Sequence, residues 1–292
     1  MADHRLSGPT DTVTLSATPA LAPLLARGAL RSPFKRPAPD AAFPRTRLVL
    51  PGVRVHLAKL AAYERVCGFP TGEPELPVTY PHVLGFPLAM RLMSGRDFPL
   101  PLLGLVHTSI EIERGAALAA DGEYDVEVRV DGLAPHRRGT EATVTTALRS
   151  RGEPVWTSRS TYLARHRTGT TTAPEPRGDA GARLPVVAEW SLGGDVGRRY
   201  GAASGDRNPI HLSPLAARLF GFPRAIAHGM WTVARCLAAH GTGGSTVVRA
   251  EFRAPVLLPG TVTYGADGSG RFELRGPGGR VHVWGEVRGG PG

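Results

Sequence analysis

Apolar residues recur three and four positions apart in the last third of the chain, which is the spacing of one buried helix face. This run predicts a helix that begins at Gly229 and ends at Gly241, with an apolar face formed by Met230, Val233, Ala234, Leu237 and Ala238. Segments rich in β-branched and aromatic residues then predict antiparallel strands over 247–252, 261–264, 272–274 and 281–287. A first strand is predicted over 186–190. The expected order of elements in this half is therefore a strand, a helix and then a meander of antiparallel strands.

The first half of the chain shows the same order of elements. Apolar residues at 84, 88, 90 and 92 predict a helix entered near Pro81. Strands are expected after it, over residues 102–112, 124–130, 140–148 and 155–163. The two halves have negligible sequence identity, so the repeat rests on element order alone.

Composition divides the chain around these two halves. Residues 166–183 are rich in Thr, Gly, Pro and Ala, which predicts a linker. Residues 1–45 are expected to form an arm, with a short helix over 21–30 and a proline-rich stretch laid on the surface. The expected organisation is therefore the arm, a first domain over 46–165, the linker and a second domain over 184–292.

The candidate chemistry lies in the segment Tyr-Gly-Ala-Ala-Ser-Gly-Asp-Arg-Asn-Pro-Ile-His, residues 200–211. Pro209 keeps Asn208 out of the helical conformation, so the run from Asp206 to His211 has to turn. Such a turn can bring the carboxylate of Asp206 and the imidazole of His211 to one side. The sequence that follows predicts a short helix with a serine cap, a proline at its first position and a glycine stop, over residues 213–221.

Gly229 is the second part of the candidate site. At the first position of the predicted helix, its N–H has no partner within the helix and carries the positive end of the helix dipole. Because glycine has no Cβ, a ligand can approach this N–H, which can stabilise an oxyanion. Each feature alone is ordinary, since such turns, lone histidines and lone glycines are usually structural. Together, within roughly thirty residues, they predict proton transfer beside an activated carbonyl.

The string from Tyr200 to His211, followed by Gly221-Phe222 and Ile226-Ala227-His228-Gly229-Met230, resembles the signature of the (R)-specific enoyl-thioester hydratases. These are also called MaoC-like dehydratases or the hydratase 2 family. The resemblance implies an α+β hot-dog fold, in which an antiparallel sheet wraps a central helix. It also implies reversible syn addition of water to a trans-2-enoyl thioester to give a (3R)-hydroxyacyl thioester, in fatty-acid or polyketide-type metabolism.

The same resemblance implies roles for individual residues. Asp206 and His211 match the catalytic aspartate and histidine of the family, and Gly229 matches the glycine that binds the thioester oxygen. We interpret Ser204 and Asn208 as hydrogen-bonding residues that hold the loop, and His228 as a further supporting residue. No metal and no other cofactor is expected. The sequence leaves open which of Asp206 and His211 acts as the acid and which as the base.

The first half resembles the non-catalytic half of acyl dehydratases with two hot-dog units, through residues 63–69 and 76–88. This implies a double hot-dog fold, a pseudo-dimer within one chain, in which the degenerate half shapes the acyl tunnel. Further pairing into a homodimer stays open. Because no partner acid stands near His82 or His107 in the sequence, we interpret both histidines as structural.

Composition narrows the partners of this chain of 292 residues. The formal charge of +10 comes from scattered arginines, and Lys35 and Lys59 are the only lysines, so no dense basic run indicates nucleic-acid binding. The arginines suit instead the phosphates of coenzyme A or an acidic acyl carrier protein. No apolar run has the length of a membrane span, and no secretory signal is evident. Cys67 and Cys236 are far apart in the sequence and show no metal-ligand spacing, so neither a disulfide scaffold nor a zinc site is expected. Because no secretory signal is evident, a cytoplasmic protein is expected.

Two alternative functions stay open at this point. A hot-dog thioesterase would release a free thiol, although it leaves the Asn-Pro-x-His context unexplained. A non-enzymatic subunit that binds an acyl thioester would retain its ligand without turnover. The acyl chain length and the choice between coenzyme A and a carrier protein are not contained in the sequence.

Overall fold

The computed structural model describes residues 11–168 and 183–290 and forms two compact units. The first unit takes its described residues from 1–53, 84–107 and 123–175, and the second from 54–83, 108–122 and 176–292. The predicted linker, 166–183, lies almost wholly outside the described residues, as does the start of the predicted arm. The predicted domain boundaries stay a prediction, since the compact units are interleaved along the chain.

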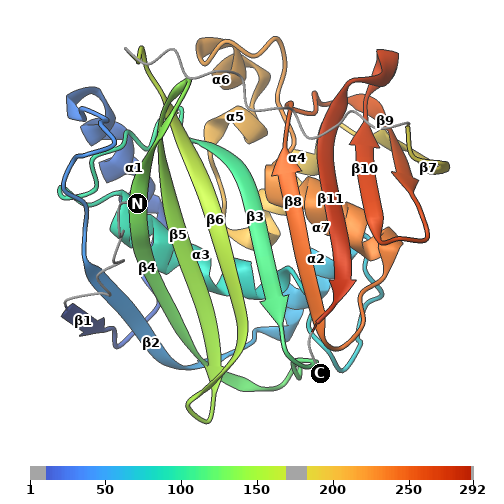
Figure 1. Ribbon diagram of the computed structural model, residues 1–292, viewed down its shortest axis with the longest axis horizontal. Helices are drawn as coiled ribbons and strands as arrows, with labels where there is room; N and C mark the ends of the chain where they lie inside the picture. The colour runs from blue at the N-terminus through green and yellow to red at the C-terminus, as the bar shows by residue number, and fades with distance from the viewer. Residues whose placement is uncertain (1–10, 169–182, 291–292) are drawn as a thin grey trace, which may run out of the picture. The chain divides into compact units, whose positions relative to one another are not determined.

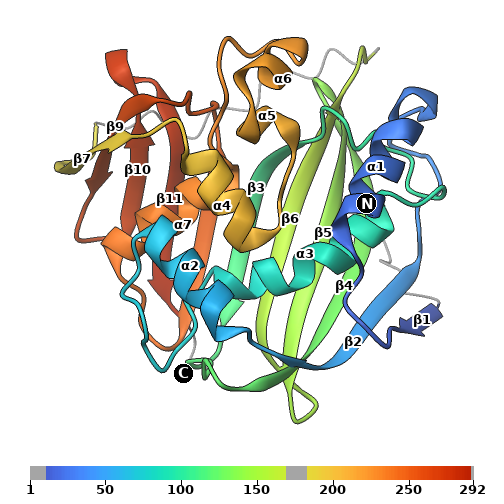
Figure 2. The same cartoon turned by 180° about the vertical axis from the view of Figure 1, so that it is seen from behind.

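The first unit is built on an antiparallel sheet with one parallel edge pair. Its elements are β1 (Asp11–Thr14), α1 (Leu21–Arg31), a 3-10 turn (Ser32–Phe34), β2 (Thr46–Arg54), most of α3 (Tyr80–Met93), β4 (Glu123–His136), β5 (Gly139–Ser150) and β6 (Glu153–Arg165). The strand order is β1-β2-β4-β5-β6, and β1 runs parallel to β2. Helices α1 and α3 cover one face of this sheet (Figure 2). The predicted helix near Pro81 and the three hairpin strands are confirmed.

Local chemistry explains the hairpins of the first unit. Arg151 and Gly152 connect β5 to β6 in a two-residue turn with positive φ at both positions, 52° and 86°. Such turns match the twist of antiparallel strands. Apolar side chains alternate along the strands and are buried at Val126, Val128, Leu148 and Trp156.

The strands of the second unit pair antiparallel in the order β3-β8-β11-β10-β9-β7 (Figure 1). Its elements are α2 (Leu57–Cys67), most of β3 (Val106–Arg114), β7 (Val186–Leu192), α4 (Val196–Ser204), α5 (Pro209–Leu212), α6 (Pro214–Leu219), α7 (Gly229–His240), β8 (Thr246–Phe252), β9 (Gly260–Ala266), β10 (Arg271–Arg275), a 3-10 turn (Pro277–Gly279) and β11 (Val281–Gly289). The predicted central helix is α7, and the four strands after it are confirmed. The prediction of a simple meander is wrong, because β8 pairs with β11 and β3 rather than with β9. The connection over residues 253–259 carries the chain past β11 and β10, and β9 then pairs with β10 and β7.

Helix α7 lies against this sheet, and its packing extends to α2. Seven of its residues are buried: Met230, Trp231, Thr232, Val233, Ala234, Cys236 and Leu237. The Trp231 indole N–H donates a hydrogen bond of 2.8 Å to the carbonyl oxygen of Val66 in α2. A buried indole N–H needs such a partner. Helix α2, which sequence analysis did not predict, is therefore part of the second unit.

A fragment of residues 184–292 is expected to self-associate or precipitate. It lacks α2 and β3, so it exposes the apolar surface that α7 and β8 bury in the full chain and leaves the Trp231 N–H without its acceptor. Size-exclusion chromatography and thermal unfolding of the fragment beside the full chain measure this. A monomeric fragment with full activity would contradict this expectation, because it would show that the second unit does not need α2 and β3.

Candidate active site

Hydrogen bonds to its own backbone shape the loop between α4 and α5. Helix α4 ends at Gly205, whose φ of 84° is the left-handed conformation that glycine adopts readily. The Ser204 hydroxyl then accepts a hydrogen bond from the Asp206 N–H at 3.2 Å, and the Asp206 carboxylate accepts one from the Asn208 N–H at 3.2 Å. The Asn208 side chain caps α5 by accepting from the Ile210 N–H at 3.4 Å. Ser204 and Asn208 therefore lie where sequence analysis placed them, in contact with the loop backbone.

Two glycines of α4 let the helix approach this loop. Gly197 and Gly201 stand four residues apart, so they share one face of the helix. A Cβ at Gly197 would overlap the carbonyl oxygen of His211, and one at Gly201 would lie 2.8 Å from the carbonyl oxygen of Asp206. Sequence analysis missed both residues, although their Gly-x-x-x-Gly spacing was visible.

Backbone carbonyls fix both histidine rings beside the loop. His211 Nδ1 lies 2.8 Å from the Ile226 carbonyl oxygen, and His228 Nε2 lies 2.9 Å from the Asp206 carbonyl oxygen. A carbonyl only accepts, so each of these nitrogens carries the proton. In the neutral rings, the lone pairs are therefore on His211 Nε2 and His228 Nδ1. The two rings stack with their centroids 3.8 Å apart.

The carboxylate of Asp206 joins the two rings in one cluster. One polar side-chain atom each of Asp206, His211 and His228 lies within 4.8 Å of the others, and Asp206 Oδ2 is 3.9 Å from His228 Nε2. The Asp206 side chain is 28% exposed and that of His228 only 2%. The expected meeting of Asp206 and His211 is thus present. Two imidazoles and a carboxylate are also ligand types that suit a divalent transition metal.

Burial keeps the imidazoles neutral. It lowers the pKa of His211, against the opposing effect of the Asp206 carboxylate. It lowers the pKa of His228 to about 3, with a further contribution from the neighbouring His211. The pKa of His82 falls to about 4 by burial, again opposed by Asp206. At neutral pH the cluster therefore holds neutral imidazoles beside one carboxylate.

We expect the free energy of unfolding to fall as the pH is lowered from about 6.5 towards 4. Both His228 and His82 have a pKa in the folded state below the ordinary 6.5, so the unfolded chain binds more protons in this range and acid favours it. Each such histidine contributes a slope of about 1.4 kcal/mol per pH unit. Denaturant unfolding at several pH values measures the slope. His228→Gln, which keeps an N–H donor, should flatten it; an unchanged slope would contradict the assignment.

Gly229 occupies the first position of α7, as predicted from the sequence. His228 is the residue before the helix, with extended φ and ψ of −63° and 137°. The Gly229 N–H therefore belongs to the first turn, which has no acceptors within the helix. An added Cβ would not face open space, however, because it would lie 3.0 Å from Cε1 and 3.1 Å from Cδ1 of the Phe252 ring. Close packing against Phe252 is thus a second reason for glycine here.

The structure adds His82 and two tyrosines to the surroundings of the site. His82, at the start of α3, is 9% exposed, and the charge of Asp206, distant in the sequence, opposes the effect of burial on its pKa. The Tyr200 ring lies 4.8 Å from that of His228, and the Tyr63 ring lies 5.9 Å from that of Tyr200. These residues are far apart in the sequence, and no local pattern indicates that they meet.

His107 differs from His82 in its surroundings. It belongs to the first unit, where its ring stacks on Tyr162 with centroids 4.6 Å apart. This contact agrees with the structural interpretation of His107 from the sequence.

Asn208→Ala and Ser213→Ala form a matched pair of cap variants. Each side chain accepts one backbone N–H at 3.4 Å, Asn208 at the start of α5 and Ser213 at the start of α6. Both variants are expected to lose about 1 kcal/mol of stability. Only Asn208→Ala should also lower kcat, by at least about tenfold, because it releases the loop that carries Asp206. Equal kcat values for the two variants would contradict a role of Asn208 at the site.

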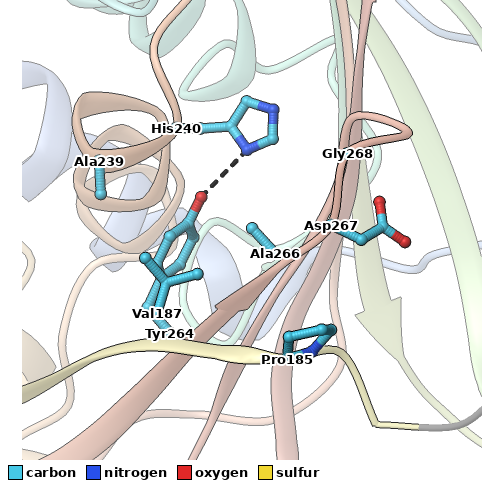
Figure 3. A pocket seen from close by; sticks show the side chains of 8 residues that line it. All are labelled: Pro185, Val187, Ala239, His240, Tyr264, Ala266, Asp267 and Gly268. Atoms are coloured by element: carbon cyan, nitrogen blue, oxygen red, sulfur yellow. Dashed lines mark hydrogen bonds between the residues drawn. The ribbon is translucent and has the colours of Figure 1, made fainter.

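A separate hollow of about 520 Å³ lies at the other end of α7, between the helix terminus and strands β7 and β9. Figure 3 shows the His240 ring facing the Tyr264 hydroxyl, and His240 Nδ1 is 3.0 Å from that oxygen. Tyr264 is buried, so this bond satisfies its hydroxyl group. The 12 residues of α7 place His240 about 16 Å from Gly229. The hollow is therefore distinct from the cluster around His211.

Solved structures that are similar to this chain identify its fold class. A crystal structure of HtdX from Mycobacterium tuberculosis matches with a TM-score of 0.73 and 34% identity, covering 83% of this chain and 99% of that chain. A second M. tuberculosis protein, described as a double hot-dog, matches with a TM-score of 0.51 and 14% identity, covering 81% of this chain and 93% of that one. The predicted α+β, double hot-dog fold is confirmed.

The sequence comparisons then give the family. Residues 188–276 match the MaoC like domain. The 3-hydroxyacyl-thioester dehydratase X of M. tuberculosis is 38% identical over 221 residues, which cover 74% of this chain and 79% of the relative. The chain belongs to the MaoC-like dehydratases. No helix in the described part of the chain is long and apolar enough to cross a membrane.

Proposed function

We propose that this protein catalyses the reversible hydration of trans-2-enoyl thioesters to (3R)-hydroxyacyl thioesters, in fatty-acid or polyketide-type metabolism. The observation that carries the proposal is the orientation of His211. Its Nδ1 is held on the Ile226 carbonyl, so Nε2 presents a lone pair in the cluster with the Asp206 carboxylate. A neutral imidazole beside a carboxylate is suited to general acid–base catalysis near neutral pH.

Activation of the substrate is assigned to the start of α7. The Gly229 N–H donates to the thioester carbonyl oxygen, at the positive end of the helix dipole. This hydrogen bond strengthens as enolate-like charge develops on the oxygen, which acidifies the proton at C2.

His211 and Asp206 share the proton transfers. In dehydration, one of them takes the C2 proton while the C3 hydroxyl receives a proton and leaves as water. Asp206 lies in the loop before α5 and His211 lies in α5, so both reach the substrate from one side, which suits syn elimination. The reverse steps add water to the double bond. The reaction moves only the elements of water, so it needs no electron carrier.

Ser204, Asn208 and His228 support this pair. Ser204 and Asn208 hold the loop that carries Asp206, and His228 donates to the Asp206 backbone and stacks on His211. The thioester is carried by coenzyme A or by a carrier protein. We also propose a cytoplasmic location, supported by two free, buried cysteines, Cys67 and Cys236. Pairing of the two units as a pseudo-dimer, and of two chains as a homodimer, stays a prediction.

The test uses crotonyl-CoA and longer trans-2-enoyl thioesters, followed by the loss of the conjugated absorbance. Coupling to an (S)-specific 3-hydroxyacyl-CoA dehydrogenase should give no signal while the absorbance falls, because the product is the (R) isomer. Robust (S) product would contradict the proposal. Release of free thiol without hydration would indicate a thioesterase, and a retained acyl thioester without turnover would indicate a binding subunit.

A further inference from the structure

Helix α6 presents apolar side chains to solvent. Leu215 is 72% exposed, Leu219 is 86% exposed, and Phe220 at the helix end is 40% exposed. Leu215 and Leu219 stand four residues apart and Arg218 lies between them, so the three share one face of the helix. Exposed apolar residues grouped in this way mark an interaction surface more often than isolated ones do.

Every charged residue in the segment of the sequence that contains α6, residues 207–250, is an arginine. No aspartate or glutamate occurs between Arg207 and Ala250. Arg207, Arg218 and Arg224 are all exposed. Arg218 and Arg224 donate to the backbone carbonyls of Pro223 and Pro259, and none of the three arginines forms an ion pair within the described residues.

The arginines of the sheet in the same unit differ in this respect. Arg249 pairs with Glu111 at 2.9 Å, and Arg288 pairs with Glu286 at 2.7 Å. Their charge is largely compensated, whereas that around α6 is available to an acidic partner.

The position of α6 connects this surface to the reaction. Ser213 is both the C-cap of α5 and the N-cap of α6, so Leu215 lies close after His211 along the chain. Helices α5 and α6 lie side by side in both views (Figures 1 and 2). A partner seated on α6 is therefore held next to α5, which carries His211 and follows the loop that carries Asp206.

We propose that the α6 face, formed by Leu215, Arg218, Leu219 and Phe220 with Arg207 and Arg224 beside it, docks an acidic carrier protein that bears the acyl thioester on a phosphopantetheine arm. This inference rests on the proposed function and names the partner of that site. Arginines alone would equally suit the phosphates of coenzyme A. The exposed leucines and phenylalanine favour a protein, because a convex apolar helix face is buried by another protein surface rather than by a nucleotide.

The test compares one enoyl group on two carriers, crotonyl-CoA and a crotonyl-loaded acyl carrier protein. Arg218→Glu and Leu219→Ser should each lower kcat/KM for the protein-linked substrate by at least about tenfold and leave the coenzyme A-linked value within about twofold. Arg65→Glu, at an exposed position on α2, is the matched charge reversal and should change neither value. For the unaltered protein, added salt should lower kcat/KM with the carrier protein, and Arg218→Glu should reduce this dependence.

Direct binding of the crotonyl-loaded carrier protein, measured by calorimetry, separates this inference from the proposed function. Weaker binding by Arg218→Glu and Leu219→Ser supports docking even if neither substrate is hydrated. Equal losses with both substrates would show that α6 only positions the loop, and unchanged binding and kinetics would show that α6 docks nothing. Loss of self-association in Leu219→Ser would assign the face to a second copy of the chain. Each of these three results overturns the proposal.

Discussion

His211→Ala and Asp206→Asn are each expected to lower kcat by roughly 10²–10⁴. His211→Ala removes the imidazole that the Ile226 carbonyl orients, and Asp206→Asn removes the negative charge from the cluster. Initial rates with a trans-2-enoyl thioester measure the losses. The double variant should lose far less than the product of the two single effects, because the residues act as a unit.

His240→Ala is the matched control for this pair. It removes a partly buried histidine at the opposite end of α7, where the ring bonds the Tyr264 hydroxyl. We expect lower stability with unchanged kcat. Fully multiplicative losses at His211 and Asp206, or an equal loss at His240, would contradict a shared catalytic pair.

Gly229→Val is expected to lower kcat by at least about 10², the effect of removing one oxyanion donor. The valine side chain would press on the Phe252 ring, which already lies 3.0 Å from the position of an added Cβ, and would shift the first turn of α7. The backbone N–H would then no longer point at the thioester oxygen. Turnover, together with thermal unfolding, measures the two effects.

The variant pair Gly229→Ala and Gly229→Ala/Phe252→Leu separates packing from catalysis. The smaller leucine makes room for the added methyl group, so it should restore stability. If the N–H position decides the rate, the double variant should also recover part of the lost kcat. Full activity in Gly229→Ala alone would show that the start of α7 tolerates a side chain and is not a close contact of the substrate.

The sequence predicted those parts of the fold that local chemistry determines. Helix α7 was visible from its apolar spacing, and β4, β5 and β6 from their alternation. Helix α4 was missed because it is short and contains Gly197 and Gly201, which lower its helix propensity. The meander was predicted wrongly because the pairing of β8 with β11 depends on the whole sheet rather than on neighbouring residues.

The candidate site divides in the same way. The meeting of Asp206 and His211 followed from Pro209, which breaks the helix locally. The electrostatic effect of Asp206 on His82 and the hydrogen bond of His211 to Ile226 depend on tertiary packing. Sequence spacing contains no information about either contact.

The interleaving of the two units bears on how the chain folds during synthesis. The hairpins of β4, β5 and β6 join neighbouring segments, so we expect them to form early. The second unit depends on contacts between distant residues: Val66 with Trp231, and Arg114 with Gly244. Helix α2 is synthesised before α7, so the apolar surface of α2 stays uncovered until α7 has left the ribosome. We therefore expect translation stalled before residue 229 to yield chains that recruit chaperones, and release of the full chain to end that dependence.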